Sequence, residues 1–163
     1  MSLTNTGGNA VAITDADSII LGTLNVGSGT LAVTAVGISQ TGTITQAAGA
    51  GAVTFNAGAG PITLTQNNNF TGAVSLSNTG ANAVAITDLN ALTLVTLAVG
   101  GNLTVTSTGA LNLGQGTVGG SLTATSNNNP ISQSSPPGLH VLRSFSLAVF
   151  GSCVQASSYS STS

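Results

Sequence analysis

Leu3 to Gly27 reads LTNTGGNAVAITDADSIILGTLNVG, and Leu76 to Gly100 reads LSNTGANAVAITDLNALTLVTLAVG. The two stretches agree at 16 of 25 positions. With looser agreement the long internal repeat covers residues 3–29 and 76–102. Self-similarity at a fixed spacing is typical of repeat architectures, in which one structural unit has been duplicated. The sequence therefore predicts an array of repeats.

A shorter period runs inside the long repeat. Large apolar residues alternate with small or polar residues in six segments: Ala10–Thr14, Thr30–Thr34, Ala52–Asn56, Ala73–Ser77, Leu103–Thr106 and Leu122–Thr125. A period of two indicates a strand that is buried on one face. The equivalent positions Val11, Leu31, Val53 and Val74 follow one another at nearly equal spacing. We therefore predict an all-β fold, a right-handed parallel β-helix (β-solenoid), with coils of roughly 18–22 residues.

Stacked coils place each strand over its equivalent, so backbone hydrogen bonds run between coils and like side chains form ladders. We expect roughly six or seven coils over residues 3–133, with Phe55 and Phe70 inside. The shift from Leu3 to Leu76 fits about four coils of the shortest expected length better than a whole number of longer ones. The number of strands per coil is left open.

The composition excludes several classes of protein. Four side chains are charged, namely Asp15, Asp17, Asp88 and Arg143, and 41% of the residues are apolar. A soluble helical domain needs a charged face and strong helix formers, and a disordered chain combines low hydrophobicity with high net charge. Without a basic patch neither nucleic acid nor an anionic lipid surface is an expected partner. Cys153 is the only cysteine, so we expect no internal disulfide.

The chain divides into three parts: a β-solenoid repeat region over residues 1–133, a Ser/Pro/Gly break at 134–138, and an atypical tail at 139–163. Proline cannot donate to a strand ladder, which favours a boundary at the break. The tail could be a membrane anchor, a cap on the open end of the solenoid, or non-native sequence left by a frameshift or truncation. Its apolar stretch, Leu139–Val154, contains His140 and Arg143 and is short of a membrane span, so no span is predicted.

The repeats resemble those of filamentous-haemagglutinin-like adhesins and other very large β-strand-repeat bacterial surface proteins. The resemblance rests on NTGxNAVAITD, LGTLNVGSGTLAVTA, GNLTVTSTGAL and GGSLTATSNNNPISQ, and it covers residues 3–133. It implies a structural stalk or adhesive repeat segment of a large secreted or cell-surface protein, which mediates attachment or biofilm contact. It also implies an extracellular or outer-cell-surface location, host or cell-surface glycans or proteins as partners, no cofactor and no catalytic residue.

The termini of the repeat region bear on export and assembly. The segment Met1–Gly8 lacks the basic and apolar regions of a secretory signal, so the signal and export domain of a secreted parent are expected outside this chain. Unpaired strand edges at the two open ends of the solenoid should promote self-association.

Two alternative functions compete with adhesion. The first is a carbohydrate-active β-helix enzyme, which needs clustered carboxylates in a groove. Here Asp15 and Asp88 occupy equivalent places in the two copies, where turn formation explains them, and Asp15 with Asp17 lacks a calcium-binding repeat motif. No Gly-x-Ser-x-Gly motif accompanies His140, and Cys153 has no near cationic neighbour. We therefore expect no catalytic, cofactor or metal site, and the chain is not expected to be an enzyme.

The second alternative is an ice-binding β-solenoid. Outward Thr-x-Thr pairs recur along the chain and would form ranks on one face of the helix. Thr also has high strand propensity, which accounts for such pairs without any ligand. The residues of this candidate face are Thr43, Thr45, Thr63, Thr65, Thr104, Thr106, Thr123 and Thr125.

Overall fold

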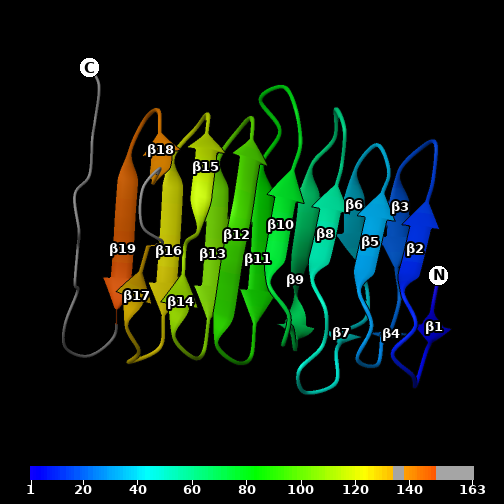
Figure 1. The fold of residues 1–163 in the computed structure, drawn as a ribbon. Helices are drawn as coiled ribbons and strands as arrows, with labels where there is room; N and C mark the ends of the chain where they lie inside the picture. Colours follow the sequence, from blue (N-terminus) through cyan, green and yellow to red (C-terminus); the bar gives the residue numbers. More distant parts are fainter. Residues whose placement is uncertain (134–137, 150–163) are drawn as a thin grey trace.

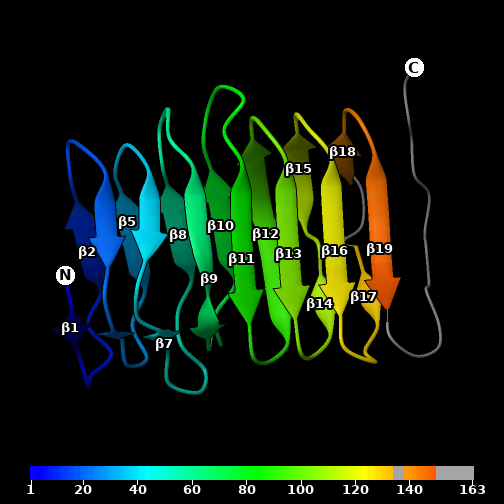
Figure 2. The same ribbon diagram turned by 180° about the vertical axis from the view of Figure 1, so that it is seen from behind.

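The computed structural model describes residues 1–133 and 138–149. Within these ranges the chain forms β-strands joined by turns and contains no helix, so the all-β prediction is confirmed. The strands are stacked in parallel coils around one axis (Figures 1 and 2). No helix long and apolar enough to cross a membrane occurs in the described part of the chain.

Two long walls face each other, and each receives one strand from each coil. The front sheet contains β2 (Val11–Thr14), β5 (Leu31–Thr34), β8 (Val53–Asn56), β10 (Val74–Ser77), β12 (Leu92–Val99), β15 (Gln115–Val118) and β18 (Leu139–Val141). The back sheet contains β3 (Ile19–Leu21), β6 (Ile38–Gln40), β9 (Ile62–Asn68), β11 (Val84–Asp88), β13 (Leu103–Ser107), β16 (Leu122–Ser126) and β19 (Phe145–Val149). The back sheet has seven strands among the described residues, so this part of the chain forms seven coils.

Short strands form a third wall, here called the short sheet, along the lower edge in Figure 1. Its first part is β1 (Leu3–Thr4), β4 (Leu24–Asn25) and β7 (Ile44–Thr45). Its last part is the start of β12 with β14 (Leu111–Asn112) and β17 (Ile131–Ser132). Between the two parts a single parallel bridge joins Thr45 to Asn69.

The coil is right-handed. In Figure 1 the front-sheet strands run upward on the near side, and the chain advances from right to left. Figure 2, the view from behind, has the back-sheet strands running downward on the side that faces the reader. The chain therefore climbs the near wall, descends the far wall and advances to the left, which is a right-handed path.

Coil length varies more widely than the sequence predicts. In the back sheet Ile19 pairs with Ile38, Ile38 with Ile62 and Ile62 with Val84. The coil from Ile38 to Ile62 is the longest of these three and exceeds the expected range, whereas the coil from Val84 to Leu103 is as short as the first. Every named strand pair is parallel, and extra residues are taken up in turns and in the register shifts of β9 against β11 and of β10 against β12.

The two copies of the long repeat lie on different walls. Val11 belongs to the front sheet, whereas Val84, its equivalent in the second copy, belongs to the back sheet. Likewise Leu3 lies in the short sheet and Leu76 in the front sheet. The predicted fit of the shift to four short coils is therefore wrong, because the shift equals three coils plus one wall. An alternating segment buries its apolar side equally well on any wall, so one sequence serves two.

Asn-x-Gly turns shape several corners of the coil. In four of them the Asn Oδ1 accepts a hydrogen bond from the N–H of the Gly two residues on, at 3.0–3.4 Å. Asn side chains mimic a backbone turn in this way. Three of the glycines, Gly27, Gly58 and Gly114, have φ of 67°, 49° and 64°, a conformation that side chains with a Cβ disfavour.

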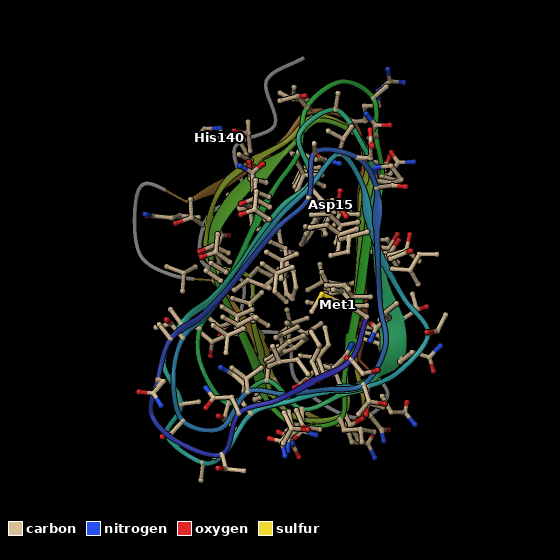
Figure 3. All side chains as sticks on the ribbon, turned by 90° about the vertical axis from the view of Figure 1, so that its right-hand side faces the viewer. Met1, Asp15 and His140 are labelled. Atoms are coloured by element: carbon tan, nitrogen blue, oxygen red, sulfur yellow. The ribbon has the colours of Figure 1, made fainter. Side chains whose placement is uncertain are left out.

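The core is a continuous column of inward side chains (Figure 3). Val53, Phe55 and Leu64 are fully buried, and the rings of Phe55 and Phe70 meet edge to face with 6.0 Å between their centroids. Both phenylalanines lie inside, as predicted. Toward the first coil the burial weakens, and Val11 and Ile19 are 8% and 7% exposed.

The solenoid extends past the expected boundary at residue 133. Beyond the break, β18 pairs in parallel with β15, and β19 pairs with β16 over five positions from Phe145 to Val149. Leu139, Val141, Phe145 and Leu147 pack partly buried against the core. The described residues of the tail thus form the seventh coil.

We predict that Phe55→Ala lowers the free energy of unfolding by about 3–5 kcal/mol, because it leaves a cavity under two coils. Urea denaturation followed by far-ultraviolet circular dichroism measures the loss. Thr54→Ala, at the exposed neighbouring position, is the matched control and should cost under about 1 kcal/mol. Equal stability of the two variants would contradict the packing described here.

Candidate functional site

The outer face of the back sheet carries most of the predicted threonine array. Thr104 and Thr106 on β13 pair in register with Thr123 and Thr125 on β16. Adjacent parallel strands lie about 4.8 Å apart, and alternate residues along a strand about 6.6 Å apart. These four residues therefore form a small regular lattice of side chains on a neutral surface.

The lattice does not continue unbroken to the remaining threonines. On β11 the position paired with Thr104 is Ala85, which is in turn paired with Thr63 of β9. The register of β9 and β11 shifts after Leu64, so Thr65 falls outside the regular pairing. Sequence reasoning missed Thr87, which pairs with Thr106 and belongs to the same face.

Thr43 and Thr45 lie on another wall. Thr45 belongs to β7 in the short sheet, where it pairs with Asn25, and its Oγ1 donates to the carbonyl of Leu24 at 3.3 Å. Thr43 precedes the same strand. The structure therefore brings six of the eight predicted threonines to the back sheet and separates these two from them.

The carboxylates do not form a cluster. Asp15 and Asp17 lie in the turn after β2, where the Asp15 Oδ1 accepts the Asp17 N–H at 3.0 Å, whereas Asp88 ends β11 and is buried. Asp88 also accepts a hydrogen bond from the N–H two residues on, that of Asn90, at 3.3 Å. Among residues 1–133 and 138–149 no group of three His, Cys, Asp or Glu side chains could hold a metal ion.

A buried polar column, which the sequence analysis did not identify, runs along one inner corner of the back sheet. It is made of Asn68, Asp88, Ser107 and Ser126, which are paired in register coil by coil. All four are buried, with 0–1% of their surface exposed. Each of these residues stands an even number of positions after the buried apolar residues of its strand, so the alternation predicts an inward side chain. A polar residue at such a position is the pattern that could have identified the column.

Hydrogen bonds satisfy the whole column. The Asn68 amide donates to the carbonyl of Thr87 at 3.0 Å and exchanges hydrogen bonds with the Gln40 amide at 2.9 and 3.0 Å. The Ser107 hydroxyl lies 2.8 and 2.7 Å from the carbonyl oxygens of Asn90 and Gly109 and can donate to either. No buried side-chain polar atom among the described residues lacks a partner, as burial of polar groups requires.

Asp88 is the one ionisable member of the column. Burial raises the pKa of its carboxyl group above the ordinary value of 3.8, because the charged form loses its hydration. Hydrogen bonds from the backbone N–H groups of Phe70, Asn90 and Leu89 act in the opposite direction but do not cancel the effect of burial. The Phe70 N–H lies 2.8 Å from Oδ1.

His140 and Arg143 line two separate surface hollows on the last coil. His140 lies on the outside of the front sheet (Figure 3), beside a hollow of about 290 Å³. Arg143 lies at the turn that follows, beside a hollow of about 230 Å³ whose lining includes Gly100, Gly101, Gly119 and Gly120. Cys153 lies outside the described residues.

Parallel coils, in-register ladders and a duplicated sequence define this chain as a β-solenoid repeat protein. A family model described as "Repeats of unknown function (DUF5649)" matches residues 8–77, 81–112 and 100–142. These matches cover more than half of the chain, and the protein belongs to that family. No curated protein and no solved structure matches it.

We predict that the protein is more stable to urea in mild acid than at neutral pH. The pKa of Asp88 is higher in the folded than in the unfolded chain. The free energy of unfolding is therefore highest at pH values below the unfolded pKa, and it decreases as pH rises through the folded pKa. Urea midpoints measured from pH 3.5 to 7.5 should therefore fall with rising pH across the interval that begins near 3.8.

Two variants identify the source of that slope. Asp88→Ser gives this coil a serine, as the next two coils have at the paired positions Ser107 and Ser126. This variant should lose most of the dependence of the urea midpoint on pH. Asp15→Ser changes the equivalent, exposed Asp of the first repeat copy and should leave the slope intact. An unchanged slope in Asp88→Ser would contradict the assignment.

Proposed function

We propose that this chain is a structural stalk or adhesive repeat segment of a large secreted or cell-surface bacterial protein of the filamentous-haemagglutinin-like type. In this role it lies outside the cell, mediates attachment or biofilm contact through host or cell-surface glycans or proteins, and catalyses no reaction. The observation that carries the proposal is the stack of seven parallel coils. Each further coil would lengthen such a rod by about 4.8 Å without a new fold.

The surface chemistry supports contact rather than catalysis. The outer walls present Thr, Ser, Ala and Asn side chains with almost no charge, and they are held on rigid strands. A carbohydrate-active enzyme is less well supported, since Asp15 lies in an exposed turn of the first coil and Asp88 is buried at the end of β11 in another coil. Ice binding is favoured only by the lattice of Thr104, Thr106, Thr123 and Thr125, which Ala85 interrupts on the next strand.

The open first coil supports association between copies. Strands β1 and β2 each pair on one side only, whereas Met1 hydrogen-bonds to Ile20 and Gly22 at the other edge of β3. The N–H of Val11 bonds to Thr30 and that of Asp15 to Thr34, both toward the next coil. By the alternation of a strand, the N–H of Ala12 points to the unpaired edge. Exposed edges of this kind template pairing with another chain.

We predict that Ala12→Pro abolishes concentration-dependent association of the full chain without unfolding it, because proline removes an N–H that only the open edge uses. Sedimentation velocity over a range of concentrations measures the association. Ala32→Pro, one coil further in and paired with Ala12, is the matched control and should destabilise the fold, because its N–H lies between two strands. Association that persists in Ala12→Pro would contradict pairing through this edge.

Attachment itself is tested by displaying the full chain on a bacterium that lacks adhesins. We predict a several-fold increase in the cells retained under flow on mucin-coated and polystyrene surfaces. A Phe55→Asp variant, which places a charge in the core, is the control for folding, since display of unfolded chain should give no gain. A folded, protease-resistant display that retains no more cells than the parent strain would overturn the adhesive role.

A further inference from the structure

The hollow beside His140 lies on the outer face of the front sheet, across its last three strands. Thr96 belongs to β12, Gln115, Gly116 and Thr117 belong to β15, and Gly138 and His140 come from the last coil. The register places Thr96 against Gln115 and Thr117 against His140. Residues far apart in the sequence, such as Thr96 and Gly138, therefore border one space of about 290 Å³.

The backbone fixes the shape of this hollow. Gly116 has φ of 130°, and a Cβ at this position would collide with the carbonyl oxygen of Leu97. Gly116, which contributes backbone to the lining, can therefore carry no side chain. Gly114, two residues earlier, has φ of 64° and turns the chain from β14 into β15. The strands β12, β15 and β18 that border the hollow are joined in one ladder, which holds their backbones in place.

The polar side chains that line the hollow beside His140 are available to bind a ligand. Thr96, Gln115, Thr117 and His140 make no side-chain hydrogen bond within the part of the chain that the structure describes. The buried or half-buried Gln40 and Gln46 amides differ, since both bond to backbone groups at corners of the coil. Four polar side chains able to donate or accept a hydrogen bond thus border one hollow.

We propose that this hollow binds one neutral pyranose residue of a glycan. A sugar hydroxyl both donates and accepts a hydrogen bond, as do a Gln amide and a Thr hydroxyl, and the His140 ring adds two nitrogen atoms that can hydrogen-bond. No carboxylate or ammonium lines the hollow, which suits an uncharged ligand. The threonine methyl groups and the Cα of Gly116 can supply apolar contacts for C–H groups of the ring. A volume near 290 Å³ lies at the lower limit of ordinary ligand pockets and suits one ring.

This inference rests on the proposed adhesive function and names its partner. A single sugar with about a dozen non-hydrogen atoms should bind with a dissociation constant of about 1 mM. Weak sites of this kind support attachment when many copies act together on one surface.

The test is a titration of the uniformly ¹⁵N-labelled full chain with the methyl glycosides of glucose, galactose, mannose and N-acetylglucosamine, followed by amide chemical shifts. At least one glycoside should shift the Gly116 and Gly138 amides in a saturable way. Gln115→Ala and His140→Ala should each weaken binding at least tenfold. Thr123→Ala, an outward substitution on the back sheet, is the matched control and should leave it unchanged.

Each outcome decides the inference separately from the adhesive function. Absence of a saturable shift with all four glycosides would overturn it, as would binding that survives both Gln115→Ala and His140→Ala. Retention of displayed cells without any glycoside shift would preserve the adhesive function and exclude this hollow as its sugar site. Saturable binding to chains that retain no cells would preserve the hollow and overturn the adhesive function.

Discussion

The backbone hydrogen bond between successive coils is the interaction on which the whole structure depends. The N–H of Leu31 donates to the carbonyl of Ala52 at 3.0 Å, and the N–H of Val53 donates to the carbonyl of Ala73 at 2.8 Å. Each coil is therefore hydrogen-bonded to the coil that follows it. A chain with one cation and three acids cannot rely on ion pairs. Its stability comes from this ladder and from the apolar column that the ladder encloses, and any interior coil is as well supported as its neighbours.

The same constraint decides where polar side chains can lie. An inward position that falls at a corner can be polar only if backbone groups of the turn satisfy it, as they do for Asp88 and Ser107. An outward position is under no such demand. The outer walls therefore hold Thr, Ser and Ala, and a shallow hollow lies where Gln115 and Thr117 of β15 flank Gly116. Sites for partners can arise on these walls without disturbing the ladder.

Much of the fold could be predicted from the sequence, and less of the site. Alternation of apolar and polar residues identified the strands, and the spacing from Val11 to Leu31 matched a true coil. The prediction that Val84 lies a whole number of coils after Val11 was wrong, since the two residues belong to different sheets. The alternation of apolar and polar residues does not indicate which sheet a strand joins. The threonine face was predicted in part. Thr104 and Thr123 are paired in the back sheet. Thr45 lies on the short sheet instead, because its strand β7 pairs with β4.

The sequence by itself determined that the chain is all-β, that its strands recur at the spacing of one coil, and that Phe55 and Phe70 lie inside, since burial of alternate apolar residues depends on local order alone. Tertiary structure decided which wall each strand joins, that Asp15 is exposed while its equivalent Asp88 is buried, and that Gln115 and His140 border one hollow. Those outcomes depend on the length of each turn and on the register between coils. They are set by contacts between residues a whole coil apart, which no local pattern records.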